Sequence, residues 1–390
     1  MRAAARVAGY DAWDLIAPEL RGIATLQFPW SVRAMDEAGA AIEQARPRLV
    51  LTYAEAGGWG RAIMLEARRR GIPSAGLQHG YIYRRWLNYL HEPDEMRPSA
   101  IMALDRGFPR PDLTVVFDRV AAHHLEVAGA FPTSALAVTG SPGLDRLAAR
   151  VRAIGATERT TVRASLGLAD GDRAAVVVSK RAQLGRWLPL LVDAVSKLDA
   201  GPGGPRRSGP DGSGGKAGLP RRSASDDGRA KAGRTLLVVK PHPAETADVY
   251  ASAVGSAAAA RLAPAGLDLA VLIAACDLVV TVNSTVAVDA MALGIPALAV
   301  GVPNNLTPFV AAGGVAGVYA PSELEPAMAR LLWDDSARAD LVAKGLACAA
   351  SGGMWSDGGA ADRAARALAD LANRGGPPAD ASGPARRGPV

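Results

Sequence analysis

A lysine and a histidine stand directly after a predicted strand in the second half of the chain. Residues 236–239 are apolar, as is typical of a buried parallel strand, and Lys240, Pro241, His242 and Pro243 follow them. The two prolines end the strand and stiffen the loop, because each fixes φ and lacks a backbone donor. Open α/β sheets bind ligands at the carboxyl ends of their strands, so Lys240 and His242 are candidate ligand-binding residues.

Amide and hydroxyl side chains follow a second predicted strand, at residues 278–282. Asn283, Ser284 and Thr285 connect this strand to a helix, and Ser284 is the predicted N-cap. Hydroxyl groups and free backbone N–H groups at the start of a helix favour a bound anion. The two loops together indicate a site for a phosphorylated ligand.

The helix predicted over 285–293 carries a single acidic side chain. Asp289 lies one turn after Thr285 on the same face, and the remaining positions are apolar. Its carboxylate could accept hydrogen bonds from ribose hydroxyls. The alternative is a solvated acid on a capped core helix.

Two further loops carry polar side chains after a strand. His79 follows the strand predicted over 74–78, where it is a candidate general base for an acceptor hydroxyl, and the alternative is a structural histidine. Lys180 and Arg181 follow the strand predicted over 174–178, where they could reach a diphosphate group. The alternative for these two cations is a solvated loop.

Size and composition favour an α/β protein without a nucleic-acid partner. The 390 residues are enough for two domains, and aromatic residues make up only 5%, which suits α/β layers better than an aromatic-rich β-sandwich. The formal net charge is +6, but the segments 201–233 and 374–390 account for all of it. We therefore expect no specific nucleic-acid binding, although these segments would be attracted to an anionic membrane.

Signals for cofactors, export and membrane insertion are lacking. No group of His, Cys, Asp and Glu has the spacing of metal ligands, and neither a P-loop nor a Gly-X-Gly-X-X-Gly motif occurs, so we expect no metal and no cofactor. Cys276 and Cys348 lie far apart, which fits a reducing compartment. No run approaches the ~18 apolar residues of a membrane span. The sequence predicts a cytoplasmic protein, peripheral at most at the inner membrane face.

The order of strands and helices predicts two doubly wound α/β domains. We predict a Rossmann-like domain shortened at its start over residues 1–150, a linker over 151–173, and a second Rossmann-like domain over 174–373. The Gly/Pro/Ser/Arg-rich segment 201–233 is predicted to be a disordered insertion, and 374–390 a disordered tail. We expect the two domains to face a cleft.

These motifs resemble the GT-B glycosyltransferase superfamily, over about 45–150 and 174–345. The stretch from Asp277 to Pro296 is similar to the superfamily pattern of a strand, Ser/Thr, an acidic helix residue and Gly-X-Pro. His79-Gly80 and the Lys-Pro-His-Pro loop resemble the paired loops of teichoic-acid glycerophosphotransferases. The tripeptide Gln78-His79-Gly80 is similar to a motif that recurs in bacterial proteins of surface-carbohydrate synthesis. Sugar-nucleotide 2-epimerases and the Kdo and capsule transferases share the helix pattern.

The resemblance implies a role for each candidate residue. His79 would be the catalytic base in the first domain. His242, Ser284 and Thr285 would contact the donor phosphates, and Asp289 the ribose. We group Lys240, Asn283, Lys180 and Arg181 with this donor-binding set. One departure is that the helix acid is often Glu in the superfamily, whereas Asp289 is one methylene shorter.

Three functions fit the resemblance. The first is a metal-independent glycosyltransferase that moves a sugar from a nucleotide-activated donor to a surface-polysaccharide or lipid-linked acceptor. The second is a polyol-phosphate transferase of the CDP-glycerol type or a sugar-nucleotide 2-epimerase, for which Glu55 is the candidate carboxylate in the first domain. The third is a non-catalytic protein that binds nucleotide sugars.

Overall fold

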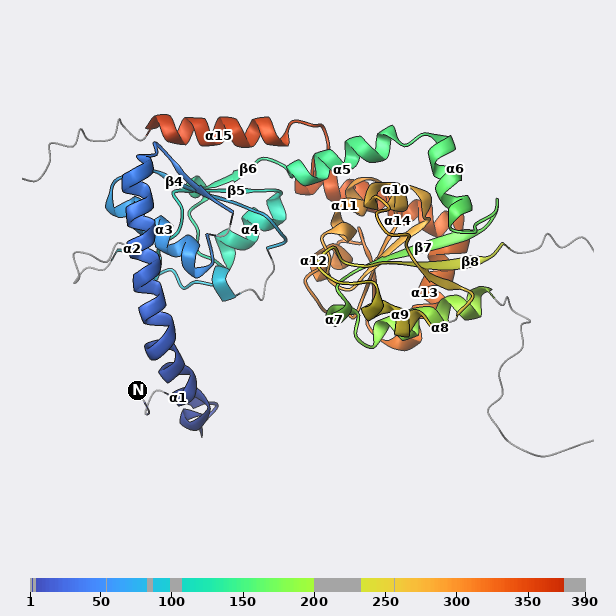
Figure 1. Ribbon diagram of the computed structural model, residues 1–390, viewed down its shortest axis with the longest axis horizontal. Helices are drawn as coiled ribbons and strands as arrows, with labels where there is room; N and C mark the ends of the chain where they lie inside the picture. The colour runs from blue at the N-terminus through green and yellow to red at the C-terminus, as the bar shows by residue number, and fades with distance from the viewer. Residues whose placement is uncertain are drawn as a thin grey trace, which may run out of the picture. The chain divides into compact units, whose positions relative to one another are not determined.

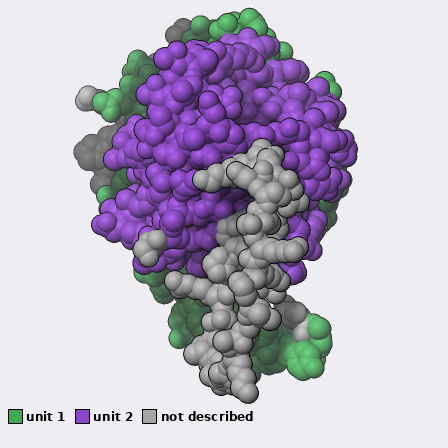
Figure 2. Space-filling view, turned by 90° about the vertical axis from the view of Figure 1, so that its right-hand side faces the viewer, with its two compact units in different colours: residues 1–142, 359–390 green, residues 143–358 purple. Residues whose placement is uncertain are grey.

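The computed structural model divides into two compact units (Figure 2). Unit 1 comprises Met1–Pro142 and Gly359–Val390, and unit 2 comprises Gly143–Gly358. The structure describes residues 2, 5–53, 55–82, 87–98, 107–199, 233–255 and 257–374. The predicted insertion 201–233, apart from Gly233, and the predicted tail 374–390, apart from Arg374, lie outside the described residues.

Unit 2 is built on a parallel sheet of six described strands. They are β7 (Arg173–Val178), β8 (Thr235–Lys240), β9 (Ala260–Leu262), β10 (Leu278–Thr281), β11 (Ala297–Val300) and β12 (Ala316–Val318). Their order across the sheet is β12-β11-β10-β7-β8-β9, with Val176 of β7 opposite Val279 of β10 and Val238 of β8. The chain winds outward from β7 in one direction, returns, and continues from β10 in the other. This is the doubly wound Rossmann order.

Ten helices accompany this sheet in the described part of the chain. They are α5 (Pro142–Ala153), α6 (Ala156–Ser165), α7 (Arg181–Leu184), α8 (Trp187–Asp199), α9 (Asp248–Val254), α10 (Leu269–Ala275), α11 (Val286–Ala292), α12 (Thr307–Ala311), α13 (Leu324–Trp333) and α14 (Asp335–Gly352). Helices α8, α9 and α13 cover one face of the sheet, and α10 and α11 cover the other (Figure 1). The strands are buried on both faces, which explains their continuous apolar sequences.

Unit 1 has a smaller parallel sheet of four described strands. They are β3 (Val50–Thr52), β4 (Ser74–Leu77), β5 (Leu113–Val116) and β6 (Leu136–Val138), which lie in chain order. Helices α3 (Gly58–Arg69) and α4 (Arg119–Val127) connect them. Gly71 ends the first of these helices in the left-handed region at φ 67°, and Pro73 prevents its continuation. Gly294 and Pro296 repeat this ending after α11.

The start and the end of the chain both contribute helices to unit 1. Before β3 lie the short strands β1 (Arg6–Val7) and β2 (Tyr10–Asp11), helix α1 (Trp13–Gly22), a π-helical segment (Ile23–Gln27) and α2 (Phe28–Ala45). Helix α15 (Ala360–Arg374) returns to this unit, where Arg363 Nε donates to the Thr139 carbonyl at 2.7 Å. No helix in the described part of the chain is long and apolar enough to cross a membrane.

The structure confirms the predicted fold class of two Rossmann-like α/β domains. The boundaries between its two compact units differ from the predicted domain boundaries. The predicted linker 151–173 belongs to unit 2 and contains α6, because this helix packs against α10. The residues from 359 onward belong to unit 1 rather than to the second domain. Helix α9 ends at Val254, and Ala260 begins an edge strand that pairs with β8.

Candidate functional site

Most candidate donor residues of unit 2 lie in the loops after its strands, whereas Lys240 is the last residue of β8 and Asp289 lies within α11. Lys180 and Arg181 follow β7, His242 follows β8, and Ser284 follows β10. Strands β7 and β10 are neighbours from which the chain winds in opposite directions. The carboxyl ends of these two strands therefore form the switch point at which open α/β sheets bind ligands.

A tyrosine joins the loops after β7 and β8. The Tyr250 hydroxyl donates to the carboxylate of Glu245 and lies 3.1 Å from the carbonyl oxygen of Ser179. The Arg181 backbone N–H donates to the same carboxylate at 3.0 Å. The hydrogen bond from Tyr250 and that from the Arg181 amide lower the pKa of Glu245. Burial, followed by the bond to Glu245, raises the pKa of Tyr250 to about 12.

The same network sets the position of His242. Its backbone N–H donates to the Tyr250 hydroxyl at 3.3 Å, and its Nδ1 accepts from the Ala244 N–H at 3.1 Å. Because Nδ1 is an acceptor, the proton of the neutral imidazole lies on Nε2. His242 thus presents an N–H donor that no described residue uses, which suits contact with a phosphate oxygen.

Two of the predicted cations have structural partners. Lys240 Nζ donates to the Leu267 carbonyl at 2.6 Å, and Arg181 Nε donates to the Val249 carbonyl at 3.0 Å. Lys180 differs, because its exposed side chain has no hydrogen-bond partner among the described residues. Of the three predicted cations, Lys180 is the one whose side chain stays available to a ligand in the described part of the chain.

Asn283 connects the loops after β10 and β11. Its Oδ1 accepts from the Asn305 N–H at 3.2 Å. The neighbouring Asn304 donates from Nδ2 to the Val282 carbonyl at 2.6 Å, and its Oδ1 accepts from the Leu306 N–H at 2.9 Å. These bonds fix the backbone from which Ser284 and Thr285 project.

Helix α11 begins one residue later than predicted. Thr285 is the N-cap residue and makes no side-chain capping bond, whereas Ser284 Oγ accepts from the Val286 N–H at 3.3 Å. The predicted N-cap Ser284 is therefore displaced by one position. Because the Val286 N–H of the first turn donates to Ser284 Oγ, the Thr285 hydroxyl makes no capping hydrogen bond to the helix.

Asp289 is an unpaired acid on a mostly buried helix. Its carboxylate has no hydrogen-bond donor among the described residues, and burial raises its pKa to about 7. A carboxylate without a protein partner is suited to accept hydrogen bonds from a ligand, which would also stabilise its ionised form.

In unit 1, His79 lies in a loop that hydrogen bonds of the neighbouring Gln78 hold in place. Gln78 is buried, donates from Nε2 to the Gly80 carbonyl at 2.9 Å, and accepts from the Phe117 N–H at 2.7 Å. His79 itself is exposed and makes an edge contact with Tyr53, with 5.5 Å between ring centroids. No described residue forms a hydrogen bond with its imidazole.

A buried carboxyl lies near His79. Glu55 is 4% exposed and accepts from the Tyr89 hydroxyl at 2.7 Å, while its other oxygen is buried without a partner in the described part of the chain. Burial raises the pKa of Glu55, although the bond from Tyr89 and the nearby His79 oppose the shift. Gly76 of β4 leaves the space for this side chain, since a Cβ there would lie 2.9 Å from it.

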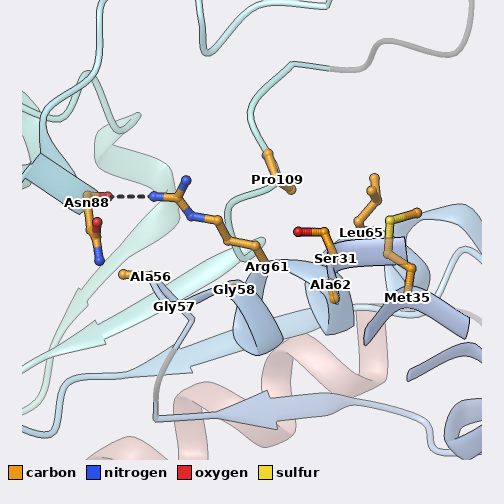
Figure 3. Close-up of a pocket in the computed structure, with 10 residues that line it drawn as sticks. All are labelled: Ser31, Met35, Ala56, Gly57, Gly58, Arg61, Ala62, Leu65, Asn88 and Pro109. Atoms are coloured by element: carbon orange, nitrogen blue, oxygen red, sulfur yellow. Dashed lines mark hydrogen bonds between the residues drawn. The ribbon is translucent and has the colours of Figure 1, made fainter. Parts of the chain in front are cut away.

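A pocket of about 360 Å3 opens in unit 1, and its lining includes Ala56, the residue after Glu55 (Figure 3). Arg61 on α3 points into the pocket region and donates to the Asn88 carbonyl at 3.3 Å, and its guanidinium lies 4.4 Å from the ring centre of Phe108. Burial lowers the pKa of Arg61. Gly57 and Gly58 line the floor next to it. Unit 1 therefore offers a partly apolar cavity with one guanidinium group.

The described residues contain no group of three or more His, Cys, Asp or Glu side chains that could hold a metal ion. The candidate residues instead offer hydroxyl, imidazole, amine and carboxyl groups.

Comparison with solved structures identifies the architecture. No protein-family model matches the chain, and no curated protein matches it by sequence. A UDP-GlcNAc 2-epimerase from Neisseria meningitidis bound to UDP-GlcNAc is similar over 88% of this chain and 81% of its own, at 13% identity and a TM-score of 0.57. A glycosyltransferase from Rickettsia africae is similar over 87% and 81%, at 9% identity and a TM-score of 0.53. The chain has the GT-B fold.

A third GT-B structure is an Anabaena protein in complex with UDP and glucose, similar over 88% of this chain and 82% of its own. Its sequence identity is 14% and its TM-score is 0.50. These likenesses confirm the predicted GT-B fold.

The sequence analysis did not identify the residues that connect the candidate loops by hydrogen bonds. Glu245 and Tyr250 form the link between the β7 and β8 loops, and Tyr89 is the partner of Glu55. Of the predicted donor residues, the network brings together the loops of Arg181 and His242. The described contacts do not join Ser284 to either loop.

Proposed function

We propose that this chain is a glycosyltransferase that moves a sugar from a nucleotide-activated donor to a glycan or lipid-linked acceptor. The observation that carries the proposal is the position of Lys180, His242 and Ser284. Each follows a different strand, and two of these strands, β7 and β10, flank the switch point of the sheet in unit 2.

The donor would bind at this edge through its diphosphate and its ribose. Lys180 and the Nε2–H of His242 supply a cation and a hydrogen-bond donor for phosphate oxygens. Asp289 supplies an acceptor for ribose hydroxyls. The similar structures from Neisseria meningitidis and Anabaena hold UDP-GlcNAc and UDP with glucose, which supports a nucleotide sugar as the donor class.

His79 would act as the base. In the reaction, the imidazole takes the proton of the acceptor hydroxyl, the new glycosidic bond forms, and the bond between the sugar and the diphosphate breaks. The diphosphate leaves with its charge stabilised by the donor-site cation and N–H groups, so no metal is required. The free imidazole of His79 supports this role, and the pocket beside Arg61 is a place for an anionic part of the acceptor.

A sugar-nucleotide 2-epimerase is the second candidate, and Glu55 favours it. Inversion at C2 of the sugar requires a C–H bond to be broken and formed again, which a carboxyl group of raised pKa can assist. Glu55 is such a group and lies near His79. The Neisseria meningitidis structure of similar fold is an epimerase.

One experiment separates the two reactions. The purified chain is incubated with UDP-, GDP- and CDP-linked sugars in D2O, with and without an acceptor fraction from bacterial envelopes. We expect nucleoside diphosphate release that depends on acceptor and no deuterium at C2. Deuterium at C2 without acceptor would establish the epimerase instead. If neither product forms, the non-catalytic nucleotide-sugar-binding function is the one that remains.

A further inference from the structure

A second pocket of unit 2 lies at the opposite end of the same sheet. Its lining includes Arg173, the first residue of β7, and Asp277 and Pro296, which directly precede β10 and β11. The candidate donor residues follow the carboxyl ends of these strands, whereas this pocket is at the amino ends. We call it the basal pocket. Its volume is about 480 Å3, within the range of small-molecule sites.

Arginine side chains dominate the charge of the basal pocket. Arg159, Arg173 and Arg338 line it, and Arg163 adjoins it through Asp277. Arg173 Nη1 lies 3.2 Å from one oxygen of Asp277, and Arg163 Nη1 lies 3.5 Å from the other. Two guanidinium groups thus share one carboxylate.

The second carboxylate near the basal pocket, that of Asp335, does not neutralise the charge of the other arginines. Asp335 pairs with Arg338 and lies 3.4 Å from Arg173 Nη2, and its side chain is 76% exposed. The exposed Arg159 on α6 has no side-chain partner among the described residues. Three arginines and one carboxylate, Asp277, therefore line the basal pocket, with Asp335 beside it, so the lining carries an excess of positive charge that attracts anions.

Hydrogen-bonding capacity also remains unused there. Arg173 Nε is buried and has no acceptor among the residues that the structure describes. This atom is not itself open to a ligand, whereas the exposed guanidinium of Arg159 is. Guanidinium groups match phosphate oxygens in geometry as well as in charge.

The rest of the lining is apolar. Val151 and Ile154 come from the end of α5 and the turn after it, Ile273 from α10, and Ile295 from the turn before β11. Ile273 is buried, but a small inorganic ion would leave the partly exposed Val151, Ile154 and Ile295 uncovered. A cationic side beside an apolar side instead fits a ligand with a phosphate group and an apolar or aromatic part.

We propose that the basal pocket binds a phosphorylated organic small molecule of nucleoside-monophosphate size, at a site separate from the donor site. The site lies within unit 2, and its arginines belong to none of the residues assigned to transfer. Ligand binding at the basal pocket therefore does not depend on the proposed glycosyltransferase activity.

Calorimetric titration with uridine monophosphate and with inorganic phosphate tests the proposal. All titrations are made in the full chain and repeated in a His242→Ala background, so that binding at the carboxyl end of the sheet is counted separately. The test variant is Arg159→Glu. The matched control is Arg146→Glu, because Arg146 is an exposed arginine of unit 2 on α5 and does not line the pocket.

We expect Arg159→Glu to weaken one binding event roughly tenfold to a hundredfold, and Arg146→Glu to leave it unchanged. Uridine monophosphate should bind this site more tightly than phosphate does. Equal loss in both arginine variants, loss of the event in His242→Ala, or no binding by the wild-type chain would overturn the proposal. If Arg159→Glu lowers the melting temperature, Arg159→Gln against Arg146→Gln makes the same comparison.

Discussion

His79 carries the catalytic part of the proposed function. The His79→Asn variant should keep its affinity for the donor and lose turnover roughly 10²–10⁴-fold, because asparagine cannot accept the acceptor proton. Donor affinity and initial rate are measured on the same purified protein. His123→Asn is the matched control, since His123 is an exposed histidine on α4 of the same unit. Near wild-type turnover in His79→Asn would exclude the base role.

Asp289 links ligand binding to pH. Its pKa of about 7 in the folded chain is far above the ~3.9 of an unfolded chain, so the folded state holds the proton more tightly. The folded state is therefore favoured at low pH, and this advantage is lost as pH rises from about 4 through 7. The penalty at pH 8 is on the order of 4 kcal/mol.

Asparagine at this position removes the ionisation. We expect Asp289→Asn to be more stable than the wild-type chain at pH 8 and the difference to shrink towards pH 4, as measured by urea unfolding. Donor affinity of the wild-type chain should rise as pH increases through about 7, because the ionised carboxylate accepts stronger, charge-assisted hydrogen bonds from ribose hydroxyls than the protonated carboxyl does. Parallel pH profiles of stability for the two proteins would contradict the assignment.

At the level of elements, Tyr250 joins the loops after β7 and β8. Tyr250→Phe leaves the Glu245 carboxylate, the His242 N–H and the Ser179 carbonyl without their shared partner. We expect a loss of stability of about 1–3 kcal/mol in urea unfolding and a weaker donor affinity. Tyr319→Phe is the control, because Tyr319 is exposed and distant in sequence from both loops. Unchanged donor affinity in Tyr250→Phe would show that the link does not position His242.

The sequence predicts the central strands well and the long-range partners poorly. β8, β10 and β11 are apolar runs that end at polar or proline residues, so their type and place follow from local pattern. β9 has three residues and exists through its pairing with β8. The return of α15 to unit 1 depends on contacts such as Arg363 with Thr139, which are 224 residues apart.

The same distinction holds for the candidate site. The loop residues Lys180, His242 and Ser284 are recognisable because each follows a strand. The bonds of Tyr250 to Glu245 and of Tyr89 to Glu55 join side chains whose proximity depends on the folded loops. The partners of Lys240 and Arg181 are main-chain carbonyls, which no residue pattern reveals.

At the level of the whole molecule, the segment 201–233 interrupts the chain between α8 and β8. Its Gly, Pro, Ser and Arg content offers almost no large apolar side chain for a core. Replacing it with a short Gly-Ser bridge should leave the melting temperature and the donor affinity nearly unchanged. A large fall in the melting temperature, measured by calorimetry, would show that the segment contributes to the folded core.

The central claim is that unit 2 binds a nucleotide sugar at the carboxyl ends of β7, β8 and β10. Isothermal titration with UDP, GDP, CDP and CMP tests it on the wild-type chain and on His242→Ala, with Arg186→Ala as a control, because Arg186 is an exposed cation that follows α7. Apart from any binding event at the basal pocket, we predict that one nucleotide class binds at this edge and that His242→Ala alone weakens that event by about 1–3 kcal/mol. Binding of equal strength in all three proteins, or no binding of any nucleotide, would contradict the account.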